Sequence, residues 1–172
     1  MNTTSSMVAI SKRTRILLSI GFSVYLIVLL YFLLFAEGFG RLSVRQDYRY
    51  NLTLFQEIRR YLTNWRRIGL RLTMINLLGN VGAFVPFGFC VPLLGCTKPK
   101  LWKAFISSLG LSAAIELTQL LSKIGCCDVD DILMNTLGGV IGYLFYKIFV
   151  AVWQKRITRS KNVSISQEKE KI

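Results

Sequence analysis

The chain contains no histidine among its 172 residues. Histidine supplies the base of a Ser-His-Asp triad and the nitrogen ligands of many zinc sites, so both kinds of site are excluded. Cysteine does not replace it, because the adjacent thiols of Cys126 and Cys127 have no further Cys or His partners nearby. Phosphate-binding loops and dinucleotide fingerprints are also absent. A bound metal would therefore take oxygen ligands, as Mg²⁺, Ca²⁺ and Mn²⁺ do.

Acidic residues are scarce: nine Asp and Glu stand against 22 Lys and Arg, giving a formal net charge of +13. Hydrophobic residues nevertheless make up 52% of the chain. This combination is unusual for a soluble domain and typical of a small multi-pass membrane protein with basic flanks. We therefore expect an all-α integral membrane bundle whose partners are membrane lipids and not nucleic acid.

Four apolar runs are long enough to cross a bilayer, which takes about 20 residues. The third run is interrupted by Glu116 and Gln119, and the fourth carries Lys147 close to its end, where the side chain can reach the interface. The first run follows basic residues, as in a signal peptide, but it exceeds the usual ~7–15 residues of such a segment. We predict four transmembrane helices, over residues 16–35, 72–94, 104–121 and 132–153.

Three further segments flank or join these spans. Residues 1–15 form a basic N-terminal flank, and the charged residues 154–172 are expected to be a disordered tail outside the membrane domain of residues 16–153. Between the first two spans, Leu52, Phe55, Ile58 and Leu62 recur at helical spacing among arginines. Such an amphipathic segment commonly lies in the membrane interface.

The distribution of basic residues favours cytoplasmic N- and C-termini by a narrow margin. With four spans, the first loop and the loop before the fourth span lie on the same side of the membrane. Arginines of the first loop can then face acidic residues of the other loop and lower the cost of both charge clusters. The candidates for this role are Arg59, Arg60, Arg66 and Arg67.

Asp128, Asp130 and Asp131 stand directly before the fourth span. Carboxylates are costly to desolvate and repel one another, so neighbouring groups must neutralise them. Asp128 is also well placed to be the N-cap of the following helix, with the other two favoured in its first turn by the helix dipole. The three carboxylates could alternatively hold a divalent cation such as Mg²⁺, whereas our first expectation is that no cofactor is bound.

Polar residues of the last three spans should meet at one depth of the membrane. The second span enters from the side to which the third exits and from which the fourth enters, so the polar residues near these ends converge. A carboxylate inside a span is a functional candidate by default, although the amides could simply join helices and Glu116 could be a protonated structural group. The predicted ligand-binding set, together with the four arginines, is Asn76, Asn80, Glu116, Gln119, Asp128, Asp130, Asp131 and Asn135.

The same residues carry a resemblance to a known family. The chain resembles the VanZ-like family in Asn76-Leu-Leu-Gly-Asn80, Phe84-Val-Pro-Phe-Gly-Phe89, Glu116-Leu-Thr-Gln119, Gly125 and Asp128-Val-Asp-Asp-Ile-Leu-Met-Asn135-Thr-Leu-Gly-Gly139. It departs from the pattern before Phe55, where the family typically has proline. The resemblance implies a small multispan protein of the bacterial cell envelope, linked to resistance against teicoplanin and related glycopeptide antibiotics.

Two classes of function fit these features. The first is a non-enzymatic protein that binds a lipid-linked cell-wall intermediate or the lipidated drug, with arginines holding its anionic groups. The second is a membrane enzyme acting on such a lipid, in which the aspartates hold a divalent cation and Glu116, Asp128 or Asp131 acts as an acid or base. We favour the first class because the sequence identifies no nucleophile.

Overall fold

The computed structural model describes residues 11–35, 48–95, 100–123 and 125–169, with side chains described as far as residue 159. The described residues are almost entirely helical, which confirms the expected all-α bundle. Two very short strands, β1 (Tyr50–Asn51) and β2 (Cys127–Asp128), pair at one end of the molecule. The helices are α1 (Lys12–Phe35), α2 (Gln56–Ile68), α3 (Leu70–Leu94), α4 (Leu101–Ser122) and α5 (Val129–Lys169).

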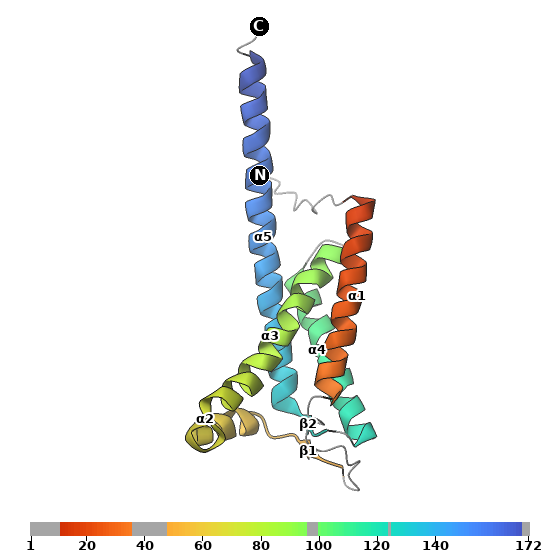
Figure 1. Ribbon diagram of the computed structural model, residues 1–172, viewed down its shortest axis with the longest axis vertical. Coiled ribbons are helices and arrows are strands. Elements are labelled where there is room, and N and C mark those ends of the chain that lie inside the picture. The colour runs from red at the N-terminus through yellow and green to blue at the C-terminus, as the bar shows by residue number, and fades with distance from the viewer. Residues whose placement is uncertain (1–10, 36–47, 96–99, 124, 170–172) are drawn as a thin grey trace.

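Four of these helices, α1, α3, α4 and α5, are long and apolar enough to cross a membrane. They correspond to the four predicted spans and form one elongated bundle (Figure 1). Most of their large apolar side chains, such as Leu17 and Ile148, are exposed in the isolated chain. In a bilayer these side chains contact lipid, so their exposure agrees with membrane insertion.

The helix α2 lies at one end of the bundle, turned across the direction of the long helices (Figure 1). Within the predicted amphipathic segment, this helix is separated from β1 by Phe55, which has a φ of 64°, and from α3 by Gly69, which has a φ of 94°. Both angles fall in the left-handed region, which glycine adopts readily. The amphipathic segment is therefore a strand and a short helix, and the chain turns abruptly at Gly69 into the membrane span.

Packing between α3 and α5 depends on glycines. A Cβ atom added at Gly142 would lie 2.0 Å from the carbonyl oxygen of Val85, and one at Gly138 would lie 2.1 Å from that of Val81. Gly139 likewise leaves room for Ser108 of α4. Small residues let membrane helices approach closely and gain dispersion contacts. Gly138, Gly139 and Gly142 therefore allow α5 to pack closely against α3 and α4.

The fourth span continues much further than predicted. Residues 154–172 were expected to be a disordered tail, but α5 remains helical to Lys169 and projects well beyond the bundle (Figure 1). The physical reason is that residues 154–169 contain neither proline nor glycine, so nothing interrupts the backbone hydrogen bonds. Residues 1–10 of the predicted basic flank and 170–172 of the tail lie outside the described residues.

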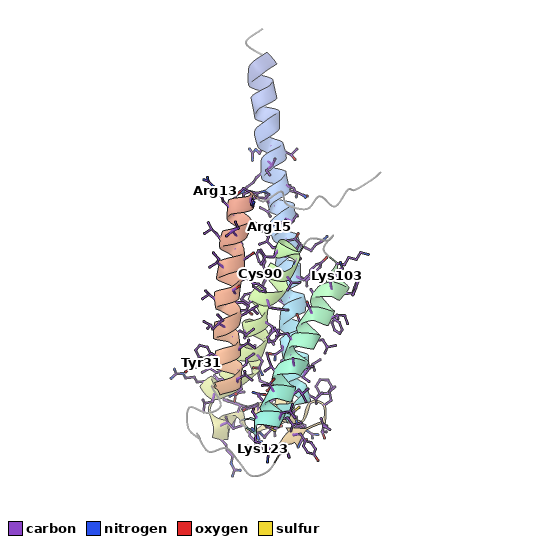
Figure 2. All side chains as sticks on the ribbon, turned by 90° about the vertical axis from the view of Figure 1, so that its right-hand side faces the viewer. Arg13, Arg15, Tyr31, Cys90, Lys103 and Lys123 are labelled. Carbon is purple, nitrogen blue, oxygen red and sulfur yellow. The ribbon has the colours of Figure 1, made fainter. Side chains whose placement is uncertain are left out.

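The ends of the spans lie as their order along the chain requires. Arg13, Arg15 and Lys103 lie toward one end of the bundle, and Tyr31 and Lys123 lie toward the other (Figure 2). The end of α1, the start of α3, the end of α4 and the start of α5 thus lie together at the second end, beside α2. Which end faces the cytoplasm stays a prediction.

We expect Gly142→Ala to destabilise the bundle by about 1–3 kcal/mol, because the methyl group overlaps the α3 backbone, which cannot move like a flexible side chain. The matched control is Gly110→Ala in α4, where an added Cβ has no neighbour within 4 Å. Alanine favours a helix over glycine by about 1 kcal/mol, so this change should be harmless or stabilising. Apparent melting temperatures in detergent measure the difference, and equal values for the two variants would contradict the packing account.

For the orientation, we expect a reporter fused after Lys100 to lie in the cytoplasm and one fused after Ser122 to lie outside. The basic flanks at Arg13, Arg15 and Lys103 motivate this direction. Paired reporters, one active only inside and one only outside, provide the measurement. If both fusions report the same side, the four-span topology is wrong; if the sides are exchanged, only the orientation is wrong.

Candidate functional site

A cavity of about 450 Å³ lies where the spans converge beside α2. We call it the polar cavity, since carboxylate, amide and guanidinium groups form much of its wall. Phe32, Leu33, Tyr61, Ile75 and Met134 supply an apolar part of the lining. The remaining lining residues are Arg49, Glu57, Arg60, Asn76, Asn80, Glu116, Gln119, Cys126, Asp128, Asp131 and Asn135.

The structure brings together most of the predicted binding residues. All the polar residues predicted on the last three spans line the polar cavity, with the exception of Asp130. They come from α3, α4 and the start of α5, as the directions of these helices require. Of the four predicted arginines, Arg60 alone is among the lining residues.

The strands β1 and β2 hold the loop before α5 in place. They pair in parallel, with Asn51 opposite Asp128, and the backbone N–H of Cys127 donates to the carbonyl oxygen of Arg49 at 3.0 Å. The Asn51 side-chain amide also lies 3.2 Å from both carboxylate oxygens of Asp128. The segments of β1 and β2, which are far apart in the sequence, are thereby joined just before α5.

Asp128 acts as the N-cap of α5, as predicted. Its Oδ1 accepts the backbone N–H of Asp130, two residues on, at 2.8 Å. Burial raises the pKa of the Asp128 carboxyl above its ordinary value, and its hydrogen bonds and the positive charge of Arg60 act in the opposite direction. The carboxyl group therefore holds its proton more readily in the folded protein than an exposed aspartate would.

Asp130 binds the backbone at the start of α2. It is fully buried, and its carboxylate accepts the backbone N–H groups of Phe55, Glu57 and Ile58. These groups belong to the first turn of α2, where no side chain of α2 itself provides a cap. A carboxylate is favoured there by both the unpaired amides and the helix dipole. Asp130 thus fastens α2 to the start of α5 and lies outside the cavity lining.

Two other carboxylates line the polar cavity and also bind neighbouring elements. Glu116 accepts the backbone N–H of Asp128 at 2.8 Å, and Asp131 accepts the side-chain amide of Asn80 at 2.5 Å. The first contact joins α4 to β2, and the second joins α3 to α5. Hydrogen bonds to charged groups of this kind contribute about 1.5–3 kcal/mol each.

Two buried amides, Gln119 and Asn135, complete the inner wall. Gln119 donates through Nε2 to the carbonyl oxygen of Leu33 at 2.8 Å, which ties α4 to the end of α1. Asn135 donates through Nδ2 to Ser112 Oγ at 2.9 Å. The Oε1 of Gln119 and the Oδ1 of Asn135 are buried and, within the described part of the chain, have no hydrogen-bond partner.

The arginines do not close over the aspartates as a group. Arg60 forms an ion pair with Glu57 of the same helix at 2.9 Å and contributes to the field at Asp128. Arg59 lines a separate surface pocket, and the exposed Arg66 and Arg67 belong to the last turn of α2. Arg49, which the sequence analysis did not single out, lines the polar cavity together with Arg60.

The three aspartates are not gathered around a common point. Asp130 binds the α2 amides, while Asp128 and Asp131 contact β1 and α3 respectively. Across the described parts of the chain, no group of three or more His, Cys, Asp or Glu side chains is arranged to hold a metal. The divalent cation that was the alternative reading of this cluster stays a prediction.

Comparison with known proteins agrees with this architecture. The model of the VanZ/LLP1 family matches residues 22–150, which is more than half of the chain. The chain belongs to the VanZ/LLP1 family. Protein VanZ of Enterococcus faecium is 30% identical over 124 residues, covering 72% of this chain and 70% of that relative. No solved structure matches the chain. Family membership and the four apolar helices together make this VanZ/LLP1 member a multi-pass membrane protein.

We expect Asp130→Asn to loosen the start of α2. The asparagine side chain is uncharged, and its NH₂ group cannot accept the backbone N–H groups that the carboxylate oxygens bind. Unfolding should become easier by about 1–3 kcal/mol, the cost of leaving buried amides unpaired. Hydrogen exchange at Glu57 and Ile58 should accelerate. The internal control is Gly69, whose N–H donates to the carbonyl oxygen of Trp65 at 2.8 Å, at the far end of α2. Unchanged exchange at both ends would contradict the fastening role.

Proposed function

We propose that this VanZ/LLP1-family protein protects the cell envelope against teicoplanin-type antibiotics by binding a lipid-linked ligand in the polar cavity. The ligand is a cell-wall intermediate or the lipidated drug itself. The observation that carries the proposal is the position of the cavity, where all four predicted spans have an end and α2 lies across them. Family membership supports the link to glycopeptide resistance.

The cavity lining suits a ligand that has both a polar head and apolar chains. Phe32 of α1 and Ile75 of α3 line the cavity and are 58% and 55% exposed, so they offer apolar surface at its edge. Acyl or prenyl chains would contact this surface from the bilayer. Arg49 and Arg60 offer guanidinium groups that pair with phosphate or carboxylate in a bidentate manner. The polar head of the ligand would then lie against the carboxylates and amides.

Binding without chemical conversion is favoured over catalysis. The sequence has no histidine, and Glu116 and Asp131 use their carboxylates to bind the backbone of β2 and the side chain of α3. A general base needs a free approach to the proton it removes. These contacts support a wall that recognises a ligand, and we propose that the protein acts without a cofactor.

We expect Glu116→Gln to abolish protection while leaving the amount of protein in the membrane unchanged. Glutamine retains an oxygen that can accept the N–H of Asp128, but the negative charge beside the ligand is lost. The minimum inhibitory concentration of teicoplanin should fall to that of cells without the protein. Thr118→Val, at an exposed position on the same helix, is the matched control and should protect fully. Full protection by Glu116→Gln at equal abundance would leave Glu116 as a structural residue.

A comparison of lipids separates binding from catalysis. Extracts from cells with and without the protein are analysed by mass spectrometry, and resistance is measured with and without a chelator. A binding protein leaves the set of lipid species unchanged and is insensitive to the chelator. A new lipid species whose formation requires Mg²⁺ would replace the binding proposal with the enzymatic one.

A further inference from the structure

The inner wall of the polar cavity presents hydrogen-bond acceptors that lack donors. Gln119 is 5% exposed and Asn135 is 1% exposed, and both line the cavity. Gln119 Oε1 and Asn135 Oδ1 have no hydrogen-bond partner among the residues that the structure describes. A buried polar atom without a partner costs about 1–3 kcal/mol, so such atoms are normally satisfied by water or a ligand.

The hydrogen bond of the Gln119 side chain determines which atom of its amide lacks a partner. Gln119 Nε2 donates to the backbone carbonyl of Leu33, which can only accept a hydrogen bond. Exchanging the nitrogen and oxygen of this amide would bring two acceptors together, so Oε1 is the atom left without a partner. Asn135 Nδ2 lies 2.9 Å from Ser112 Oγ, but a hydroxyl can donate or accept, so this contact alone does not fix the orientation of the Asn135 amide. The unmet requirement set by these contacts is therefore for a donor to Gln119 Oε1.

The charges around these acceptors have the sign that attracts a cation. Glu116 and Asp131 line the cavity from α4 and α5, the same helices that carry Gln119 and Asn135. Arg49, which precedes β1, and Arg60 of α2, which is paired with Glu57, also line the cavity. We call the part of the lining around Gln119 and Asn135 the acceptor-rich wall, and the part around Arg49 and Arg60 the basic wall.

We propose that the acceptor-rich wall binds a primary ammonium group, which donates to Gln119 Oε1 beside Glu116 and Asp131. The basic wall binds the anionic part of the same ligand. The ligand class is therefore zwitterionic, an amine linked to a phosphate or carboxylate, as in an aminophospholipid head group. This inference rests on the proposed function in taking the polar cavity as the binding site, and it adds the chemistry of the head group.

Ethanolamine and choline head groups provide the decisive comparison. Both carry one positive charge beside a phosphate, but the choline nitrogen has three methyl groups and no N–H donor. A cavity that recognised charge alone would accept both. A cavity that needs a donor for Gln119 Oε1 rejects choline, because that oxygen would remain unpaired and the methyl groups would be forced against it.

The test uses the full-length protein purified into mixed micelles with equimolar phosphatidylethanolamine and phosphatidylcholine of identical acyl chains. Native mass spectrometry counts the lipid molecules of each kind that remain bound. We expect about a tenfold preference for phosphatidylethanolamine, since one hydrogen bond from a charged donor is at stake. Equal retention of the two lipids by the unaltered protein would overturn the proposal, and this result needs no variant.

Two variants at Gln119 attribute the preference to the acceptor. Gln119→Leu and Gln119→Glu both lose the N–H that donates to Leu33, so they share any structural damage from that loss. The first removes the acceptor and the second retains one. We expect the lipid preference to disappear in Gln119→Leu and to persist in Gln119→Glu. Loss in both variants, or in neither, would contradict the assignment to Oε1. Thr118→Val should behave as the unaltered protein.

A soluble competitor identifies the source of the ammonium group. O-phosphoethanolamine is added to the complex at millimolar concentration, with phosphocholine as the matched control. Displacement of the lipid by the first compound alone means that a free amine-phosphate head group is sufficient. A preference between the two lipids without displacement means that the acyl chains are also required. Displacement by both compounds equally would overturn the requirement for N–H donors.

The outcomes for head-group recognition and for resistance are separate. A protein that protects against teicoplanin but does not distinguish the two lipids contradicts the ammonium assignment alone. A protein that prefers the ethanolamine lipid but gives no protection contradicts the proposed role in resistance alone.

Discussion

Asp130 is fully buried, and a buried carboxylate is tolerated only where hydrogen-bond donors surround it. In this protein the donors are backbone amides at the first turn of α2, supplied by a segment more than 70 residues earlier. That one requirement places the amphipathic helix against the start of the last span. The pairing of β1 with β2 and the contact of Asn51 with Asp128 follow beside it. The end of the bundle is therefore organised by donors to carboxylates.

With these contacts made, each of four neighbouring carboxylates binds a different hydrogen-bond donor. Asp128 caps α5, Asp130 caps α2, Glu116 binds the backbone before α5, and Asp131 binds Asn80 of α3. Like charges placed close together would repel strongly if they shared one partner. Distribution among different donors lets them lie near one another and gives a cavity wall with fixed geometry. A fixed wall discriminates between ligands better than a mobile one, because less ordering is needed on binding.

The convergence of Asn76, Glu116 and Asn135 could be predicted from sequence because it depends only on the directions of successive spans. Which arginines line the cavity could not be predicted from the sequence. It depends on the rotation of α2 about its own axis, which is set by Asp130 and by the left-handed residue Phe55. The partners of Asp130 could not be recognised in the sequence, because they are backbone N–H groups, which every residue except proline carries. The length of α5 was underestimated because the charge of residues 154–172 suggested disorder, although residues 154–169 contain no proline or glycine to interrupt a helix.

The unbroken course of α5 has a mechanical consequence. At 1.5 Å per residue, its 41 residues span about 60 Å, which is twice the hydrocarbon thickness of a bilayer. One end of this rod is capped by Asp128, which lines the polar cavity, and the other end projects past the opposite face of the bundle. A tilt of about ten degrees at the cavity would move the far end by roughly 10 Å without any change in internal structure. By geometry alone, a small change in the tilt of α5 at the cavity thus corresponds to a large displacement at its far end.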